Sequence, residues 1–201
     1  MPVAEAPRPY HHGRLRETLV DSALELARTG GPEAVVLRAV SRAAGVSHNA
    51  AYRHFADHEE LLAAVGARCM QRLAALMTER TAGAAGRDPV ERAWSRLEAV
   101  GRAYVEFAVT EPGWFRTAFS AGHAAPAGTE PGPYELLGAR LDELVEVGAV
   151  PAERRPGAEH PAWAMVHGLS TLLVEGPLRG LEPAAVERAT EGVLTVVRRG
   201  L

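Results

Sequence analysis

The fold of this chain is decided by the stretch AAGVSHNAAYRHF at residues 43–55. Gly45 can adopt the positive φ of a tight turn, where other residues would be strained. Ser47 follows at the position of a helix N-cap, where its hydroxyl can accept a hydrogen bond from a backbone N–H. We therefore predict a helix that ends near Ala44, a tight turn at Gly45, and a second helix of about two turns.

The second predicted helix has a small inward face and a larger polar face. Ala51 and Phe55 lie one turn apart, so we expect both to point inward. The side chains left pointing outward are His48, Asn49, Tyr52 and Arg53. Polar groups on a short exposed helix suit a surface that hydrogen-bonds a partner. A helix-turn-helix places such a helix in the major groove of DNA.

Residues 37–58 are basic, although the chain as a whole is not. They carry Arg38, Arg42 and Arg53 against the single acid Asp57, whereas the formal net charge of the chain is −3. This distribution favours DNA contact at one place. It argues against a protein that coats nucleic acid indiscriminately.

Two further helices complete a predicted three-helix unit around this stretch. The helix before it carries an apolar stripe at three- and four-residue steps: Leu15, Leu19, Ala23, Leu26 and Ala27. The short helix that enters the turn places Leu37, Val40 and Ala44 inward. After the stretch, Asp57 and Glu60 have the spacing of a capping box. They open a long helix whose predicted buried seam is Leu61, Val65, Cys69, Leu73 and Leu76.

The rest of the chain predicts more helices and no strand. Proline and glycine punctuate apolar, helix-spaced segments, of which the last two are residues 162–175 and 184–199. We predict an all-α fold of about nine helices. Its domains are a helix-turn-helix DNA-binding domain at residues 10–57 and a larger helical domain at residues 58–201. We expect residues 1–9 to be disordered and residues 120–133 to form a mobile loop.

Composition excludes several classes of protein. Cys69 is the single cysteine, so one chain cannot form a disulfide or a multi-thiolate metal site, and we expect this thiol to be inert packing. No apolar run approaches the roughly 20 residues of a membrane-spanning helix, and the first residues lack a signal pattern. We therefore expect a cytoplasmic protein with no membrane partner. The pair His11-His12 indicates a metal site only weakly, and we predict no metal, no cofactor and no catalytic residues.

Residues 10–62 resemble the DNA-binding domain of the tetracycline-repressor-like (TetR) family. The resemblance is carried by these segments: Leu15-Arg16, Ala23, Gly31, Leu37-Arg38, Val40, Ala44-Gly45-Val46-Ser47, Tyr52-Arg53-His54-Phe55 and Glu60-Leu61-Leu62. The opening Tyr10-His11-His12-Gly13 is similar to one branch of that family. The Trp163-x-x-x-His167-Gly168 pattern is typical of the same branch.

The resemblance implies a ligand-responsive transcriptional regulator, usually a repressor. Such a protein binds a palindromic operator as a homodimer and is released by a small molecule, whose identity the sequence does not give. The implied DNA-binding residues are Arg38, Ser47, His48, Asn49, Tyr52, Arg53, His54 and His58. Two positions depart from the family pattern. Val36 replaces the Ser or Thr that usually caps the second helix, and His58 replaces a lysine that touches phosphate.

Two further predictions concern residues 58–201. Aromatic and flexible side chains could line an effector cavity or merely fill the core: Trp94, Trp114, Phe115, Phe119, Met165 and His167. The segment at 162–175 is apolar over more than one stripe, with Leu169 at its centre. We therefore expect the homodimer to form through residues 162–175 and 184–199 as a four-helix bundle.

Two other functions compete with the regulator. A helical enzyme would need a nucleophile with a base, a carboxylate pair or a metal set, and none occurs at recognisable spacing. A helical protein-interaction module would account for the apolar segment at 162–175. It would not account for the polar outward face of residues 48–53.

Overall fold

The computed structural model describes residues 12–120 and 131–201. Within these ranges the chain is all-helical, as predicted, with nine α-helices and two short 3-10 turns. The helices are α1 (His12–Gly30), α2 (Leu37–Ala43), α3 (His48–Tyr52), α4 (His58–Ala82), α5 (Pro89–Thr110), α6 (Pro112–Ser120), α7 (Pro133–Glu146), α8 (Glu159–Val174) and α9 (Pro183–Gly200). None of the helices in these ranges combines the length and the apolar content that a membrane crossing needs.

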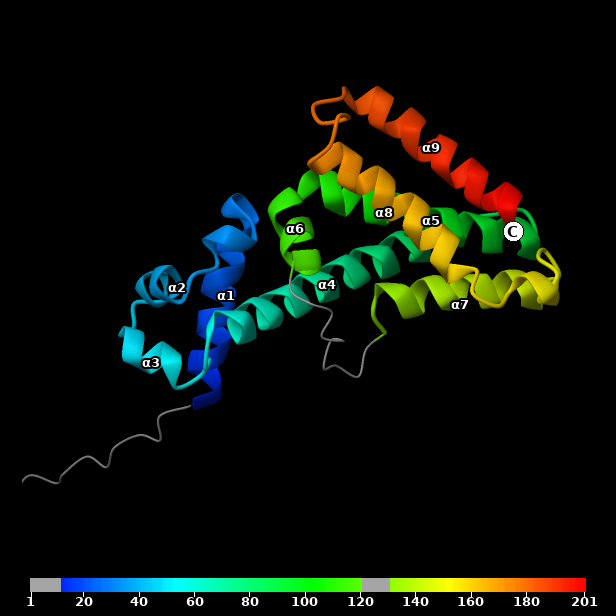
Figure 1. Ribbon diagram of the computed structural model, residues 1–201. Helices are drawn as coiled ribbons and strands as arrows, with labels where there is room; N and C mark the ends of the chain where they lie inside the picture. Colours follow the sequence, from blue (N-terminus) through cyan, green and yellow to red (C-terminus); the bar gives the residue numbers. More distant parts are fainter. Residues whose placement is uncertain (1–11, 121–130) are drawn as a thin grey trace, which may run out of the picture.

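The helices form an elongated molecule with a small and a large end. Helices α1–α3 gather at one end, and α4 runs from them to the helices of the other end (Figure 1). Helix α6 lies between the two groups and packs on both α1 and α4. The predicted domain boundary between residues 57 and 58 coincides with the start of α4 and stays a prediction.

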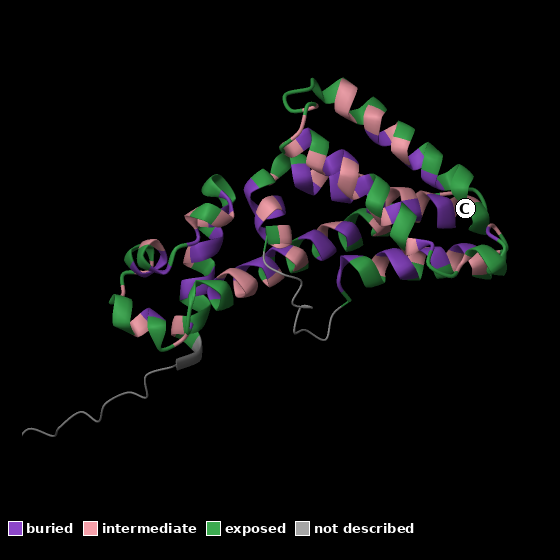
Figure 2. Cartoon of the chain, viewed as in Figure 1, coloured by how far each residue is buried: buried purple, intermediate pink, exposed green. Residues whose placement is uncertain are grey.

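Two apolar clusters hold the helices together. The larger one runs without interruption from Leu19 and Phe55 of the small end, along α4, to α5, α6 and α8. The smaller one joins α5 and α7 around Trp94 and Leu141. Buried positions accordingly follow one side of each helix, as Figure 2 shows. The first cluster therefore joins the two ends of the molecule in one continuous core.

The seam of α4 follows a strict four-residue step. Leu61, Val65, Cys69 and Leu73 are fully buried, as predicted. Leu76, the predicted fifth member, is only half-buried, and Met77 takes its place at 1% exposure. The prediction failed because it placed the fifth buried residue three positions after Leu73. The buried row of α4 instead continues in steps of four residues, which places Met77 there.

Helix boundaries differ from the predicted ones at two places. Helix α3 ends at Tyr52 and is one turn shorter than predicted, with Phe55 buried just beyond it. Helix α8 begins at Glu159 rather than Ala162, because Pro161 lies in the first turn, where its missing N–H costs nothing. The tail at 1–9 and most of the predicted loop at 120–133 lie outside the described residues.

Candidate nucleic-acid interface and ligand cavity

The turn between α2 and α3 has the geometry that its sequence predicts. Gly45 has φ = 67°, and a Cβ added there would meet nothing within 4 Å, so backbone conformation alone requires glycine. The Val46 N–H donates to Ser41 O at 3.0 Å, and the Gly45 N–H donates to Arg42 O at 3.2 Å. These two bonds form a Schellman motif, which satisfies the last carbonyls of α2. The turn therefore fixes α3 relative to α2.

Local capping starts α3 and holds it on the core. The Ala50 N–H donates to Ser47 Oγ at 3.2 Å, which confirms the predicted N-cap. Ala51 and Phe55 are both fully buried, and the guanidinium of Arg16 lies 4.6 Å from the Phe55 ring centroid. Two inward anchors thus leave His48, Asn49, Tyr52 and Arg53 facing solvent.

The outward face of α3 carries the predicted DNA-contact groups. His48, Asn49, Tyr52 and Arg53 are all exposed, Tyr52 at 49%. The rings of His48 and Tyr52 meet edge to face at 4.7 Å, which orders both on one side of the helix. Such a face offers hydrogen-bond donors and acceptors on a protruding element, as base and phosphate contacts require.

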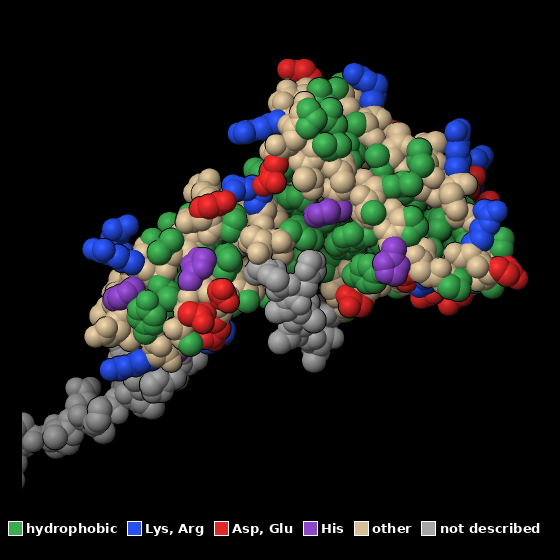
Figure 3. Space-filling view, in the orientation of Figure 1, with side chains coloured by type: hydrophobic (Ala, Val, Ile, Leu, Met, Phe, Trp, Pro, Cys, Tyr) green, Lys and Arg blue, Asp and Glu red, His purple; other side chains and the backbone are tan. Residues whose placement is uncertain are grey.

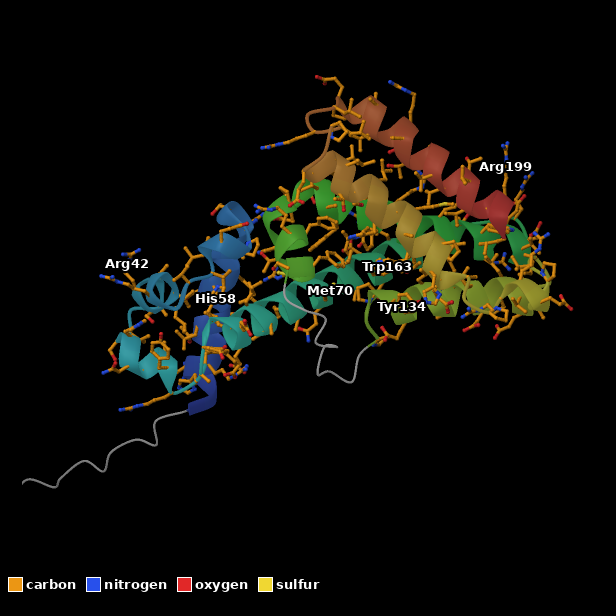
Figure 4. All side chains as sticks on the ribbon, in the orientation of Figure 1. Arg42, His58, Met70, Tyr134, Trp163 and Arg199 are labelled. Atoms are coloured by element: carbon orange, nitrogen blue, oxygen red, sulfur yellow. The ribbon has the colours of Figure 1, made fainter. Side chains whose placement is uncertain are left out.

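The remaining predicted DNA-binding residues surround this face. Arg38 of α2 and the N-cap Ser47 are exposed, and His54 is half-buried. His58 is exposed at the start of α4, where Figure 4 labels it together with Arg42 of α2. Arginine and histidine side chains appear on this end of the surface in Figure 3. The structure thus places all eight predicted residues at the small end of the molecule.

The two departures from the family pattern have different structural outcomes. Val36, the N-cap residue of α2, makes no side-chain hydrogen bond to the helix and is 47% exposed. By contrast, Asp57 Oδ1 accepts from the Glu60 N–H at 2.8 Å, and Glu60 reaches back to the Ala56 N–H at 2.8 Å. The N-terminus of α4 is therefore well capped, and His58 is its first residue.

An aromatic cluster joins α5, α6 and α8 in the larger end. Tyr104 is surrounded by the rings of Phe115, Phe119, Trp163 and His167, with centroids 5.1–6.3 Å away. The Tyr104 hydroxyl and His167 Nδ1 are 2.8 Å apart. Burial raises the pKa of Tyr104, so its phenol stays protonated. Trp163 also meets Tyr134 of α7 at 5.6 Å, and Figure 4 labels this pair.

The structure brings together only half of the predicted ligand-binding residues. Phe115, Phe119 and His167 belong to the aromatic cluster, whereas Trp94 lies in the smaller apolar cluster under Arg198. Met165 points outward from α8 at 37% exposure. Sequence reasoning did not single out Tyr104 or Trp163 as site residues. The position of Trp163 one helical turn before His167 was the available signal.

Trp114 lies at the contact between α1 and α6. Its indole N–H donates to Leu24 O at 2.9 Å, and the guanidinium groups of Arg28 and Arg72 lie over the ring at 5.2 and 4.4 Å. A Cβ at Gly113 would lie 2.2 Å from the carbonyl oxygens of Ala27 and Arg28. Helix α6 therefore docks on the last turn of α1 with backbone against backbone, which only glycine permits.

The internal cavity beside the aromatic cluster is small. Tyr104 and Trp163 line it together with Met77, Gly101 and Val166, and its volume is about 30 Å³. That is the space of one water molecule. Apart from Tyr104 and Trp163, the lining residues carry no polar side-chain group. A larger ligand at this place requires the surrounding side chains to move.

The outer faces of α8 and α9 leave apolar side chains uncovered. Met165 and Leu172 of α8 are 37% and 42% exposed, and Val196 of α9 is 53% exposed. Leu169, at the centre of the predicted dimer segment, is 7% exposed and packs inward on the protomer's own core. The helix has one stripe for its own core and a second stripe, through Met165 and Leu172, that the protomer does not cover.

Metal and thiol chemistry find no support in the described part of the chain. No group of three or more His, Cys, Asp or Glu with metal-binding geometry occurs among residues whose side chains are described. His11 lies outside the described residues, and the side chain of His12 is not described. Burial raises the pKa of the Cys69 thiol to about 12, so its nucleophilic thiolate is scarce at neutral pH.

Comparison with known proteins gives two family matches. Residues 19–65 match the family of bacterial regulatory proteins named tetR, and residues 97–197 match the tetracyclin repressor-like C-terminal domain. An 88-residue segment is 36% identical to the HTH-type transcriptional repressor KstR of Rhodococcus jostii (strain RHA1). That segment covers 44% of this chain and 40% of KstR, less than half of either protein.

Solved structures are similar over nearly the whole chain. A protein with unknown function from Rhodococcus sp. RHA1 is 29% identical, with a TM-score of 0.68 over 97% of this chain and 99% of its own. A TetR-family transcriptional regulator from Streptomyces coelicolor has the same fold, with a TM-score of 0.63 at 22% identity over 93% of this chain and 99% of its own. RolR in complex with resorcinol also shares the fold, with a TM-score of 0.60 at 15% identity over 96% and 95% of the two chains.

Proposed function

Because the chain belongs to the tetracycline-repressor-like (TetR) family, we propose that it is a cytoplasmic repressor that a small molecule releases from its operator. Regulators of this family are DNA-binding transcription factors and not enzymes, so we assign no catalytic residues. The observation that carries the proposal is the exposed face of α3, where His48, Asn49 and Tyr52 stand on a helix that Ser47, Ala51 and Phe55 fix in place.

DNA contact divides between two kinds of residue. Tyr52, Arg53 and His54 contact backbone phosphates, while Ser47, His48 and Asn49 lie near the start of α3 and reach base edges or phosphates. Arg38 and His58 add phosphate contacts from α2 and α4. Phosphate contacts set the position of the helix on the duplex, and base contacts set the preferred sequence.

A homodimer gives the operator its symmetry. The uncovered stripe of α8, through Met165 and Leu172, and Val196 of α9 are the surface on which a second copy packs. Two copies related by a two-fold axis present two α3 helices to successive major grooves, about 34–36 Å apart. The operator is therefore roughly palindromic.

The effector acts through the helices that touch both ends of the molecule. A ligand that widens the cavity beside Tyr104 displaces Phe115 and Phe119, and α6 carries that displacement to α1 through the Gly113 contact. Release from DNA requires that the ligand prefer one arrangement, and a preference of about 3 kcal/mol changes operator affinity roughly a hundredfold. The RolR complex with resorcinol supports a small-molecule effector in this fold.

The proposal is tested by the salt dependence of binding to duplex DNA. Fluorescence anisotropy with a labelled duplex gives the dissociation constant across a series of salt concentrations. We expect affinity to fall steeply with salt, because phosphate contacts release counterions. A protein-interaction module would give no saturable binding to duplex DNA, and that result would reject the regulator.

A further inference from the structure

A groove separate from the aromatic cluster opens where the two ends of the molecule meet. The end of α1, the junction of α5 and α6, and the turn between α8 and α9 surround it; these segments lie together in Figure 1. Its volume is about 700 Å³, against about 30 Å³ for the cavity beside Tyr104. Ligand pockets in proteins range from about 300 to 1,000 Å³. We call this space the interdomain groove.

One side of the interdomain groove is aliphatic and uncovered. Val109 at the end of α5 and Leu181 before α9 are each 40% exposed, and both line the groove. Val174, Leu178 and Val186 are half-buried beside them. Aliphatic side chains from three elements thus converge on one open space, an arrangement that marks a binding surface more often than isolated exposed residues do.

The other side of the groove carries three arginines, of which two are paired with carboxylates. Arg28, Arg116 and Arg179 line it against a single acid, Glu175. Two of these arginines are held in place by carboxylates. Arg28 donates twice to Glu111, at 2.8 and 2.7 Å, and Arg116 donates to Glu175 at 2.8 Å and to Glu33 at 2.6 Å.

The arginines retain capacity for a further anion. A guanidinium has five N–H donors, and the bonds of Arg28 and Arg116 leave Nη1 of each unused within the described ranges. Arg179 is exposed and forms no ion pair with any residue that the structure describes. The groove therefore offers fixed donors to an incoming acid, together with one guanidinium, Arg179, that has no ion pair among the described residues.

We propose that the interdomain groove binds an aliphatic carboxylate as a second ligand site of this protein. The carboxylate is held by Arg179 and by the free Nη1 group of Arg28, and the alkyl chain covers Val109 and Leu181. A ligand with both features uses both sides of the groove, whereas an inorganic anion or a neutral alkane uses only one.

The wall between α1 and α6 is preorganised for this ligand. Gly31 has φ = 66°, and an added Cβ would lie 2.6 Å from Arg116 Nη1, so the guanidinium rests directly on the backbone of the turn. The backbone contact at Gly113 fixes the neighbouring part of the same wall. Groups already held in place lose little conformational entropy on binding, which favours affinity.

The proposed site touches both ends of the molecule without involving the aromatic cluster. Arg28 lies in the last turn of α1 and Gly31 directly follows that helix, while Arg179 and Leu181 precede α9. A ligand here thus contacts the DNA-binding end and the end that carries the dimer stripe. This site does not depend on the proposed function, because binding to the groove is measurable without DNA.

The test is nuclear magnetic resonance on full-length protein labelled with ¹⁵N-glycine, titrated with decanoate below its micelle concentration. Gly31, Gly113 and Gly180 line the groove, and Gly101 lines the cavity beside Tyr104, so glycine signals separate the two sites. We expect saturable shifts at Gly31, Gly113 and Gly180. Arg179→Gln should raise the dissociation constant at least tenfold, and neutral decanamide should bind at least tenfold more weakly than decanoate.

Arg87→Gln is the matched control and should leave decanoate binding unchanged. Arg87 is exposed just before α5, at the opposite end of that helix from Val109 of the groove. Shifts at Gly101 without shifts at Gly31 and Gly180 would overturn the proposal, as would equal affinity in Arg179→Gln. The alternative is that a second copy of the chain fills the groove in place of a ligand. In that case the Gly31 and Gly180 signals would change with protein concentration and not with decanoate, which also overturns it.

Discussion

The helix-turn-helix segment at residues 37–57 and the aromatic cluster around Tyr104 are built in different ways. In the segment, the Gly45 turn, the Ser47 cap and the two anchors depend on close neighbours in the chain. In the cluster, the hydrogen bond between Tyr104 and His167 joins residues 63 positions apart. Local spacing determines the first region, whereas the second exists only after whole helices have packed.

This difference separates the expected effects of substitution. The outward side chains of α3 are exposed and are proposed to contact DNA, so their loss should leave stability unchanged. Residues at contacts between helices or between copies serve assembly, so their replacement should weaken folding or dimerisation.

Leu172→Glu should have the largest effect, on dimerisation. Leu172 is 42% exposed in the protomer, so the variant folds, but a dimer would bury an unpaired carboxylate. We expect the dimer dissociation constant to rise at least a hundredfold, or about 3 kcal/mol, in sedimentation equilibrium. Val90→Glu, at a position with 37% exposure on α5, is the control and should leave the dimer intact. An unchanged dissociation constant for Leu172→Glu would place the dimer contact elsewhere.

Gly113→Ala should destabilise the fold by breaking the contact of α6 with α1. The added Cβ would lie 2.2 Å from two carbonyl oxygens of α1, so helix α6 must shift. We expect the free energy of unfolding in urea to fall by about 3 kcal/mol. Gly83→Ala is the control, because Gly83 has φ = −85° and its nearest neighbour to an added Cβ is at 3.8 Å. Equal stability of the two variants would contradict the close docking of α6.

Substitutions on α3 should weaken DNA binding without affecting the fold. Tyr52→Ala and Arg53→Ala each remove a proposed phosphate contact and should cost about 1–3 kcal/mol on every duplex. Asn49→Ala should instead reduce discrimination at one base pair by about 1–3 kcal/mol. Electrophoretic mobility shifts measure affinity, and thermal unfolding should match wild type. Arg87→Ala serves as the control, and loss of stability in the α3 variants would contradict the comparison.

His58→Lys should have the smallest effect, and it should depend on pH. A lysine keeps its charge throughout, whereas a histidine gains charge only as the pH falls toward 6. With salt held constant, we expect the lysine variant to bind the operator a few-fold more tightly at pH 8, by less than about 1 kcal/mol. Its affinity should also vary less between pH 6 and pH 8. Coincident curves for the two proteins would remove His58 from the DNA contacts.

Features that depend on adjacent residues could be predicted from the sequence, whereas contacts between distant segments could not. Gly45, Ser47 and Asp57 could be assigned because a positive φ or a cap is a property of a few adjacent residues. The inward direction of Ala51 and Phe55 also follows from helix periodicity. The length of α3 was overestimated, because the anchor Phe55 lies beyond its last turn and periodicity does not show where a helix stops.

Prediction failed where distant segments meet. Trp94, Trp114 and Phe115 are all aromatic residues in predicted helices, yet they lie in three different places. Trp94 lies in the smaller cluster, Trp114 at the contact with α1, and Phe115 beside Tyr104. Leu169 and Leu172 belong to one apolar segment, and only packing decides which of them faces the protomer's own core. The interdomain groove could not be predicted, because its lining comes from three separate parts of the chain.

Selection of duplexes from a randomised library by the purified protein shows whether α3 reads DNA sequence. Wild-type protein should enrich a palindromic sequence with half-sites about one helical turn apart, since two α3 helices read successive major grooves. Asn49→Ala should enrich the same palindrome with one position in each half-site relaxed. Two results would contradict the assignment of α3 as the DNA-reading helix. One is that the wild-type protein enriches no sequence. The other is that a Tyr52→Ala, Asn49→Ala double variant enriches the same sequence with equal stringency.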